Sequence, residues 1–98
     1  MKKAPPAPPE YLGDSSKRFW EQVCDRYLLE PHELVLLTFA CQALDRIESG
    51  RQAIAKDGAF IVGQRGRLVA HPATKVIKDS EDSFRLILGK LDLKHVGA

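Results

Sequence analysis

Large apolar residues recur with helical spacing soon after the first dozen positions. From residue 13 onward they fall three or four positions apart, on one face of a helix: Phe19, Trp20, Val23, Cys24 and Tyr27. Asp14 and Ser15 stand at the start of this pattern, and both residue types cap the free amides of a helix. We therefore expect a first helix beginning near residue 13, capped by Asp14 or Ser15 and anchored in the core by Trp20.

A second helix is predicted from Pro31 to about Lys56. Proline suits the first helical position, and Asp57-Gly58 supplies a stop signal. Its first half, residues 34–44, is apolar at nine of eleven positions, whereas a helix on a small domain needs only one apolar stripe. Because a small domain has little material to cover such a helix, we expect self-association. The candidates for this buried or intersubunit surface are Leu34, Leu36, Leu37, Phe39 and Leu44. Further along the helix, Asp45 and Arg46 are expected to face water.

The spacing changes to a β pattern between residues 59 and 71. Two short β-prone runs, 60–62 and 67–69, flank the four residues 63–66, which predicts a hairpin with a four-residue loop. An isolated hairpin is marginally stable in water. We therefore expect this one to rest on a helix or on a neighbouring copy of itself.

A third amphipathic helix is predicted to open at His71-Pro72 and to run to about Leu93. Its charged face holds three oppositely charged pairs at i,i+4 spacing, which are typical of a solvated surface: Lys75–Asp79, Lys78–Asp82 and Glu81–Arg85. The predicted fold is thus mainly all-α, with three helices and a small β-hairpin between the second and third. This domain spans residues 13–93, between a Pro-rich arm at 1–12, anchored by Tyr11-Leu12, and a short tail at 94–98.

Composition narrows the class of protein. Ninety-eight residues with 44% apolar and 29% charged side chains are typical of one globular domain. No apolar run approaches the roughly 20 residues that span a bilayer, and the basic N-terminus lacks the apolar core of a signal peptide. Two cysteines are too few for a disulfide framework. They suit reduced thiols in a cytosol, and no membrane partner is predicted.

The net charge of +2 conceals a segregation of charge along the chain. Residues 10–50 hold eight acidic and four basic side chains, whereas residues 51–78 hold six basic side chains against Asp57 alone. Arg65 and Arg67 lie in the glycine-containing loop with no acid nearby in sequence. Such guanidinium groups suit phosphate contact, but they equally suit pairing with the acidic half of a neighbouring subunit. Both interpretations remain open from these residues.

Catalytic and metal-binding patterns are missing from the sequence. Cys24, His32, Cys41 and His71 form no pair with metal-ligand spacing. The chain has no Gly-x-Ser-x-Gly motif, and residues 63–67 lack the layout of a phosphate-binding P-loop. No metal, no cofactor and no enzymatic activity are predicted.

The order of these elements resembles the small subunit of phage terminase, specifically the group called the P27 family. The matching features are the Pro-rich lead into Tyr11-Leu12, a short helix around Phe19-Trp20, a long helix, Asp57-Gly58 with a short strand, the glycine turn, and residues 68–73 before the last helix. The family commonly has Asn-Pro where this chain has His71-Pro72, so we expect a weaker helix cap there. The family often continues into a Thr/Ser-Pro and Arg-rich tail, whereas this sequence ends soon after residue 93. If that tail contacts DNA or the large subunit, we expect this sequence to be a fragment that lacks part of the function.

The resemblance implies a non-enzymatic protein of the host cytoplasm that assembles into a homo-oligomeric ring. It further implies recognition of viral double-stranded DNA and regulation of the terminase large subunit, which holds the ATPase and nuclease. The candidates for DNA contact are Arg65, Arg67, Lys75, Lys78, Lys2 and Lys3. Arg51 and Lys56 are weaker candidates.

Two other functions fit parts of the sequence. A dimeric helix–turn–helix regulator would use the first two helices, although the second opens with few side chains able to read bases. An assembly adaptor would use the basic segment to meet an acidic partner rather than nucleic acid.

Overall fold

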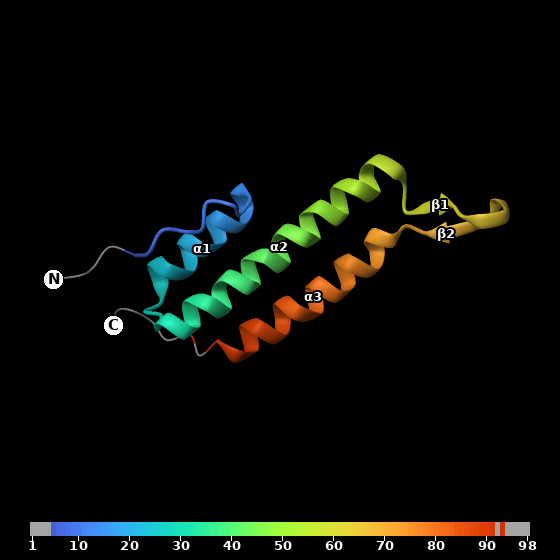
Figure 1. Ribbon diagram of the computed structural model, residues 1–98. Helices are drawn as coiled ribbons and strands as arrows, with labels where there is room; N and C mark the ends of the chain where they lie inside the picture. The colour runs from blue at the N-terminus through green and yellow to red at the C-terminus, as the bar shows by residue number, and fades with distance from the viewer. Residues whose placement is uncertain (1–4, 92, 94–98) are drawn as a thin grey trace.

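The computed structural model describes residues 5–91 and 93 of the 98-residue chain. Its elements, in order, are α1 (Asp14–Arg26), α2 (Pro31–Asp57), β1 (Phe60–Val62), β2 (Leu68–Ala70) and α3 (Pro72–Lys90) (Figure 1). A short 3₁₀ turn, Gln64–Gly66, joins the two antiparallel strands. The prediction of a mainly helical chain with a hairpin between the second and third helices is therefore confirmed.

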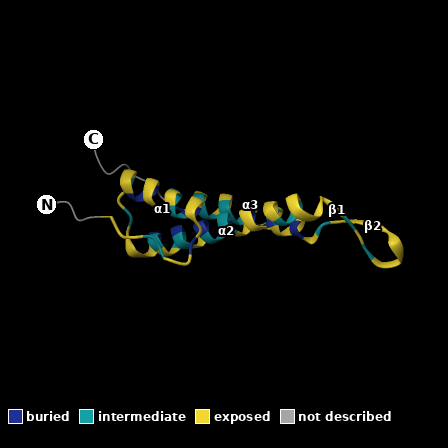
Figure 2. Cartoon of the chain, turned by 90° about the horizontal axis from the view of Figure 1, so that it is seen from above, coloured by how far each residue is buried: buried dark blue, intermediate teal, exposed yellow. Residues whose placement is uncertain are grey.

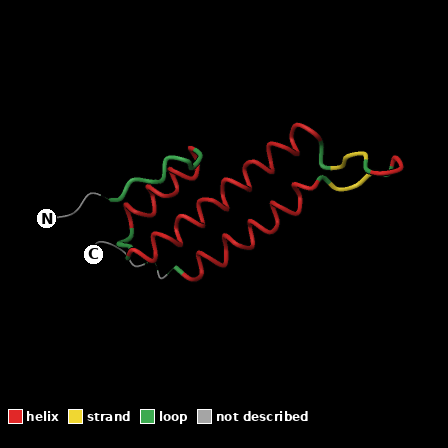
Figure 3. The backbone as a smooth tube through the Cα atoms, in the orientation of Figure 1, coloured by secondary structure: helices red, strands yellow, loops and turns green. Residues whose placement is uncertain are grey.

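The molecule is elongated rather than spherical. α2 and α3 run antiparallel along its length, α1 packs beside the first half of α2, and the β-hairpin extends from the far end (Figures 1 and 3). The extents are 64 × 23 × 20 Å and the radius of gyration is 17.0 Å, compared with about 13 Å for a compact chain of this length. Exposed residues consequently line much of the molecule, the hairpin most of all (Figure 2).

A small core holds α1 against α2. Trp20 and Leu12 are each 4% exposed, which confirms both as anchors, whereas Tyr11, the other predicted anchor, is 66% exposed. The indole N–H of Trp20 donates to the Pro6 carbonyl oxygen at 2.9 Å and so ties the extended arm to the core. The buried members of this cluster are Leu12, Trp20, Val23, Cys24, Leu37 and Cys41.

The start of α1 differs from the sequence prediction. Its N-cap is Gly13, and neither Asp14 nor Ser15 caps the helix. The acceptor comes instead from α2, because the Asp45 carboxylate accepts from the Gly13 amide at 3.2 Å and from Ser16 Oγ at 2.6 Å. Asp45 therefore does not simply face water as expected; it joins the first turn of α1 to the middle of α2.

The α2–α3 pair is held by close packing at a glycine and by polar contacts. A Cβ placed on Gly50 would lie 2.6 Å from Ile77 Cγ1, so only glycine permits this approach. Arg46, expected to face water, donates through Nε to Ser80 Oγ at 3.2 Å. Arg51 Nη2 lies 3.7 Å from Glu81 Oε2.

One of the three predicted i,i+4 ion pairs is wrong. Glu81 contacts Arg51 of α2, and Arg85 pairs with Asp82 at 3.0 Å instead. The packing of α3 on α2 brings a guanidinium group from another helix within reach of Glu81, which spacing along one helix cannot reveal.

The junction between the helices and the hairpin is organised by His71. Gly58 ends α2 with φ of 90°, a conformation that favours glycine. His71 then caps α3, because its Nδ1 accepts from the Ala73 amide at 2.9 Å while Nε2 donates to Asp57 at 3.0 Å. The expected turn is thus present and this histidine does cap the helix, although α3 ends at Lys90 rather than near residue 93.

Candidate nucleic-acid interface

The β-hairpin is short, and its turn is longer than predicted. Phe60 pairs with Ala70 and Val62 with Leu68, so the connection spans residues 63–67 rather than four residues. Arg67 belongs to this turn, not to the strand. Arg65 adopts φ of 60°, in the left-handed region that side-chain-bearing residues rarely occupy, and Gly66 follows at 72°.

Alternation along the strands gives the hairpin two different faces. Successive side chains of a strand point to opposite sides, and paired residues share a side. One side, here named the hairpin face, is wholly apolar and exposed; it consists of Phe60, Val62, Leu68 and Ala70. Arg67 lies opposite Gly63, whose amide donates to the Arg67 carbonyl at 2.7 Å, and this position alternates with Leu68. The Arg67 guanidinium therefore belongs to the side that carries Ile61 and Val69.

No helix of the described chain covers the hairpin face. Phe60 is 63% exposed, Val62 71% and Leu68 69%. The expectation that the hairpin rests on a helix is therefore wrong within a single chain (Figure 2). The alternative, a neighbouring copy, stays a prediction.

The cations predicted to contact DNA differ in their surroundings. Lys75 and Lys78 pair with Asp79 at 2.8 Å and Asp82 at 3.7 Å, and the hydrogen bond to Asp79 raises the pKa of Lys75. Across residues 5–91 and 93, no such partner is found for the exposed side chains of Arg65, Arg67 and Lys56. Within this described part of the chain, these three cations therefore lie unpaired at the hairpin end of the molecule, whereas Arg26 and Lys90 are exposed and unpaired at the opposite end. Lys2 and Lys3 lie outside the described residues.

The residues predicted for a buried or intersubunit surface differ in how far they are exposed. Leu37 is fully buried and belongs to the core of the single chain, which removes it from any exposed interface. Leu34, Leu36 and Leu44 are half-buried, whereas Phe39 is 48% exposed. Sequence reasoning missed Val35, which is 52% exposed. The spacing of four residues between Val35 and Phe39 places both on one face of the helix and could have identified Val35.

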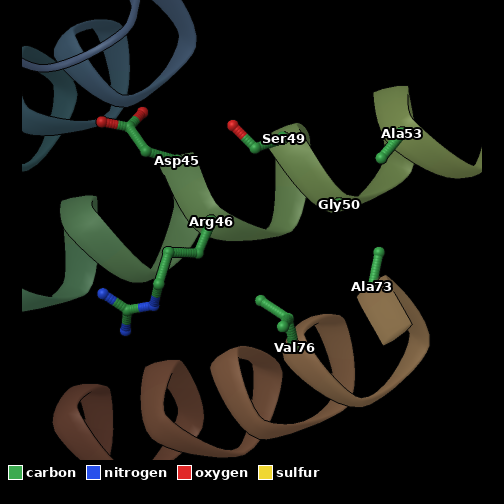
Figure 4. A pocket seen from close by; sticks show the side chains of 7 residues that line it. All are labelled: Asp45, Arg46, Ser49, Gly50, Ala53, Ala73 and Val76. Atoms are coloured by element: carbon green, nitrogen blue, oxygen red, sulfur yellow. The ribbon is translucent and has the colours of Figure 1, made fainter. Parts of the chain in front are cut away.

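A shallow open pocket lies between α2 and α3, with Ser49 and Ala53 on one helix and Ala73 and Val76 on the other (Figure 4). Its two charged residues, Asp45 and Arg46, are already engaged by α1 and Ser80. Within the described part of the chain, no group of three or more potential ligands is placed to hold a metal ion. The pocket offers small side chains and no reactive group.

The two cysteines are buried thiols. Cys41 Sγ donates to the Ser16 carbonyl at 3.4 Å. Burial, with smaller effects from Asp45 and Cys24, raises the pKa of Cys41 to about 12, and burial also raises that of Cys24. Both groups remain protonated at neutral pH and are poor nucleophiles.

Comparison with known proteins decides the family. A family model described as "Phage terminase, small subunit" matches residues 16–96, more than four fifths of the chain. The chain belongs to the phage terminase small-subunit family. This membership gives it a role in phage DNA packaging, and small terminase subunits are generally non-catalytic.

Searches of curated proteins and of solved structures returned no match. Over the described residues, every helix is too short or too polar to cross a membrane.

Proposed function

We propose that this terminase small subunit belongs to the P27 group and acts as a non-catalytic, ring-forming DNA-recognition subunit. In the host cytoplasm it binds viral double-stranded DNA and regulates the ATPase and nuclease of the large subunit. The family match supports the role in packaging. The observation that carries DNA contact is the gathering of unpaired cations at the hairpin end.

Arg65 and Arg67 are the first candidates for this contact. Guanidinium groups bind phosphate oxygens with two parallel hydrogen bonds, and these two have no competing carboxylate in the described chain. Lys56 lies at the same end, as the last basic residue of α2. Lys75 and Lys78 are second candidates, because phosphate would first have to displace Asp79 and Asp82. Lys2 and Lys3 would add contacts from the arm.

The first experiment compares the double variant Arg65→Ala/Arg67→Ala with Lys75→Ala/Lys78→Ala. DNA from the packaging start site is titrated by fluorescence anisotropy over a range of salt concentrations. We predict that the arginine variant binds more weakly and that its log–log salt slope falls by about two, because each lost phosphate contact removes roughly 0.9. The lysine variant should change the slope less.

Solution mass by light scattering serves as the control for this experiment. The arginine variant should keep the mass of the wild type. An arginine variant with wild-type affinity would contradict the proposed site. If the variant loses its oligomeric state instead, the arginines are interface residues.

An assembly adaptor is the second candidate, because the exposed hairpin face is apolar and suits a protein contact. It predicts an oligomer without measurable affinity for DNA. A helix–turn–helix regulator has less support, since α2 lies between α1 and α3 with Leu37, Ala40 and Cys41 fully buried. A recognition helix needs a free polar face for the major groove.

A further inference from the structure

The hairpin face needs a partner. A two-stranded ribbon alone is marginally stable in water, and this one exposes Phe60, Val62 and Leu68 by more than 60% each. The apolar side chains lie on one side, whereas the Arg67 position belongs to the other. The hairpin face is thus free to contact protein while the opposite side and the turn remain available for DNA.

A second apolar surface lies at the other end of the molecule, where α2 begins. Val35 is 52% exposed and Phe39 48%, and their i,i+4 spacing places them on one face of α2. Leu28, in the link just before α2, is 76% exposed. We name these three residues the α2 entry patch.

The two apolar surfaces cannot meet within one chain. The link before α2 and the hairpin lie at opposite ends of a molecule 64 Å long (Figure 1). A contact between them requires a second copy. Because the two surfaces differ, this contact is heterologous, the kind that generates rings when the rotation closes.

The distribution of charge indicates which surface of the second copy contacts the hairpin face. The hairpin end carries the unpaired cations Arg65 and Arg67, and residues 58–70 hold no acid. The α2 entry end carries the exposed acids Glu21, Asp25 and Glu30 against two exposed cations, Arg26 and, at the end of α3, Lys90. Pairing two hairpins would bring like charges together, whereas the α2 entry end, with more acids than bases, does not repel the hairpin end and leaves Arg65 and Arg67 unpaired.

We infer that the hairpin face of one chain docks on the α2 entry patch of the next copy. This inference rests on the proposed assembly of the subunit into a homo-oligomer and names the two surfaces that build it. The contact covers Phe60, Val62 and Leu68 with the exposed apolar residues at the start of the neighbour's α2.

Complementation between two variants tests this arrangement. The first variant, Val62→Glu/Leu68→Glu, destroys the hairpin face, and the second, Leu28→Glu/Val35→Glu, destroys the α2 entry patch. All four side chains are more than half exposed, so the fold should persist, which circular dichroism checks. Leu86→Glu is the matched control, because this leucine of α3 is 62% exposed and belongs to neither surface.

Light scattering should report single chains of 10.9 kDa for each double variant alone and the wild-type mass for Leu86→Glu. An equimolar mixture of the two variants should give pairs of twice the single-chain mass. The intact hairpin face of the entry-patch variant can dock on the intact α2 entry patch of the hairpin variant, and no other contact can form. The inference is overturned if the wild type is a single chain, if the entry-patch variant keeps the wild-type mass, or if the mixture stays as single chains.

DNA binding by the wild type, measured in parallel, separates this inference from the proposed function. Successful complementation without DNA affinity would contradict the proposed function and leave the docking contact standing. DNA affinity with failed complementation would overturn the docking contact alone.

Discussion

At the scale of single residues, Gly50 and Gly89 make a matched pair with opposite expected effects. An alanine Cβ at position 50 would meet Ile77 at 2.6 Å, whereas at position 89 it would meet nothing within 4 Å. We predict that Gly50→Ala lowers the free energy of unfolding by about 1–3 kcal/mol through overpacking. Gly89→Ala should leave it unchanged or raise it by up to about 1 kcal/mol, because alanine favours helix. Urea unfolding at fixed protein concentration measures both, and equal stability of the two variants would contradict the close packing of α3 on α2.

Cys41 gives a prediction about pH. Its pKa is about 12 in the folded chain, against an ordinary 9.0, because it is buried. The folded state therefore holds this proton more tightly, and the resulting stability is present below pH 9 and is lost as the pH rises from 9 to 12. Over this range, the free energy of unfolding of the wild type should fall more steeply than that of Cys41→Ala. Urea titrations at several pH values compare the two slopes; parallel slopes would refute the prediction.

At the scale of elements, His71 joins the end of α2 to the start of α3. His71→Ala removes the acceptor for the Ala73 amide and the partner of Asp57, and should cost about 1 kcal/mol, as other lost caps do. His71→Asn should keep most of this stability, because asparagine is a strong cap. Chemical denaturation with hydrogen exchange at the Ala73 amide measures both effects. An asparagine variant as unstable as the alanine variant would show that Asp57 contributes more than the cap.

The elements themselves could be predicted because their signals are local. Pro31 and Pro72 open helices, Gly58 ends one, and apolar spacing identifies the faces. Contacts between distant residues could not be predicted. Asp45 stands 32 positions from Gly13 whose amide it binds, and Arg51 reaches Glu81 from another helix. Local rules assigned Asp45 to solvent and paired Glu81 with Arg85 on its own helix.

The candidate site was predictable to a similar degree. The absence of nearby acids singled out Arg65 and Arg67, and the structure leaves both without a carboxylate partner among the described residues. The composition of the two hairpin faces could not be predicted. The predicted second strand began at Arg67, one residue too early, and so placed Arg67 in the strand instead of the turn. Leu37 was one of five candidates for a buried or intersubunit surface, and the sequence could not separate these two roles, since an all-round apolar helix does not reveal which side α1 covers.

At the scale of the whole molecule, length mismatch explains why the hairpin face is uncovered. α1 has 13 residues and α2 has 27, which correspond to about 20 and 40 Å of helix. α1 can therefore cover only part of α2, and the hairpin extends beyond both. A chain of this shape buries little of itself, and contacts with other copies or with DNA are the remaining ways to cover its ends.

Trp20 gives the chain a single intrinsic fluorescent probe. It is the only tryptophan in the chain, it is almost fully buried, and its indole N–H is bonded to the Pro6 carbonyl. Its fluorescence is therefore an intrinsic optical reporter confined to one half of the molecule. Release of the arm would change the emission while the helices stay folded. Melting of the distant hairpin would leave it unchanged, so ellipticity and emission together resolve which half of the molecule responds.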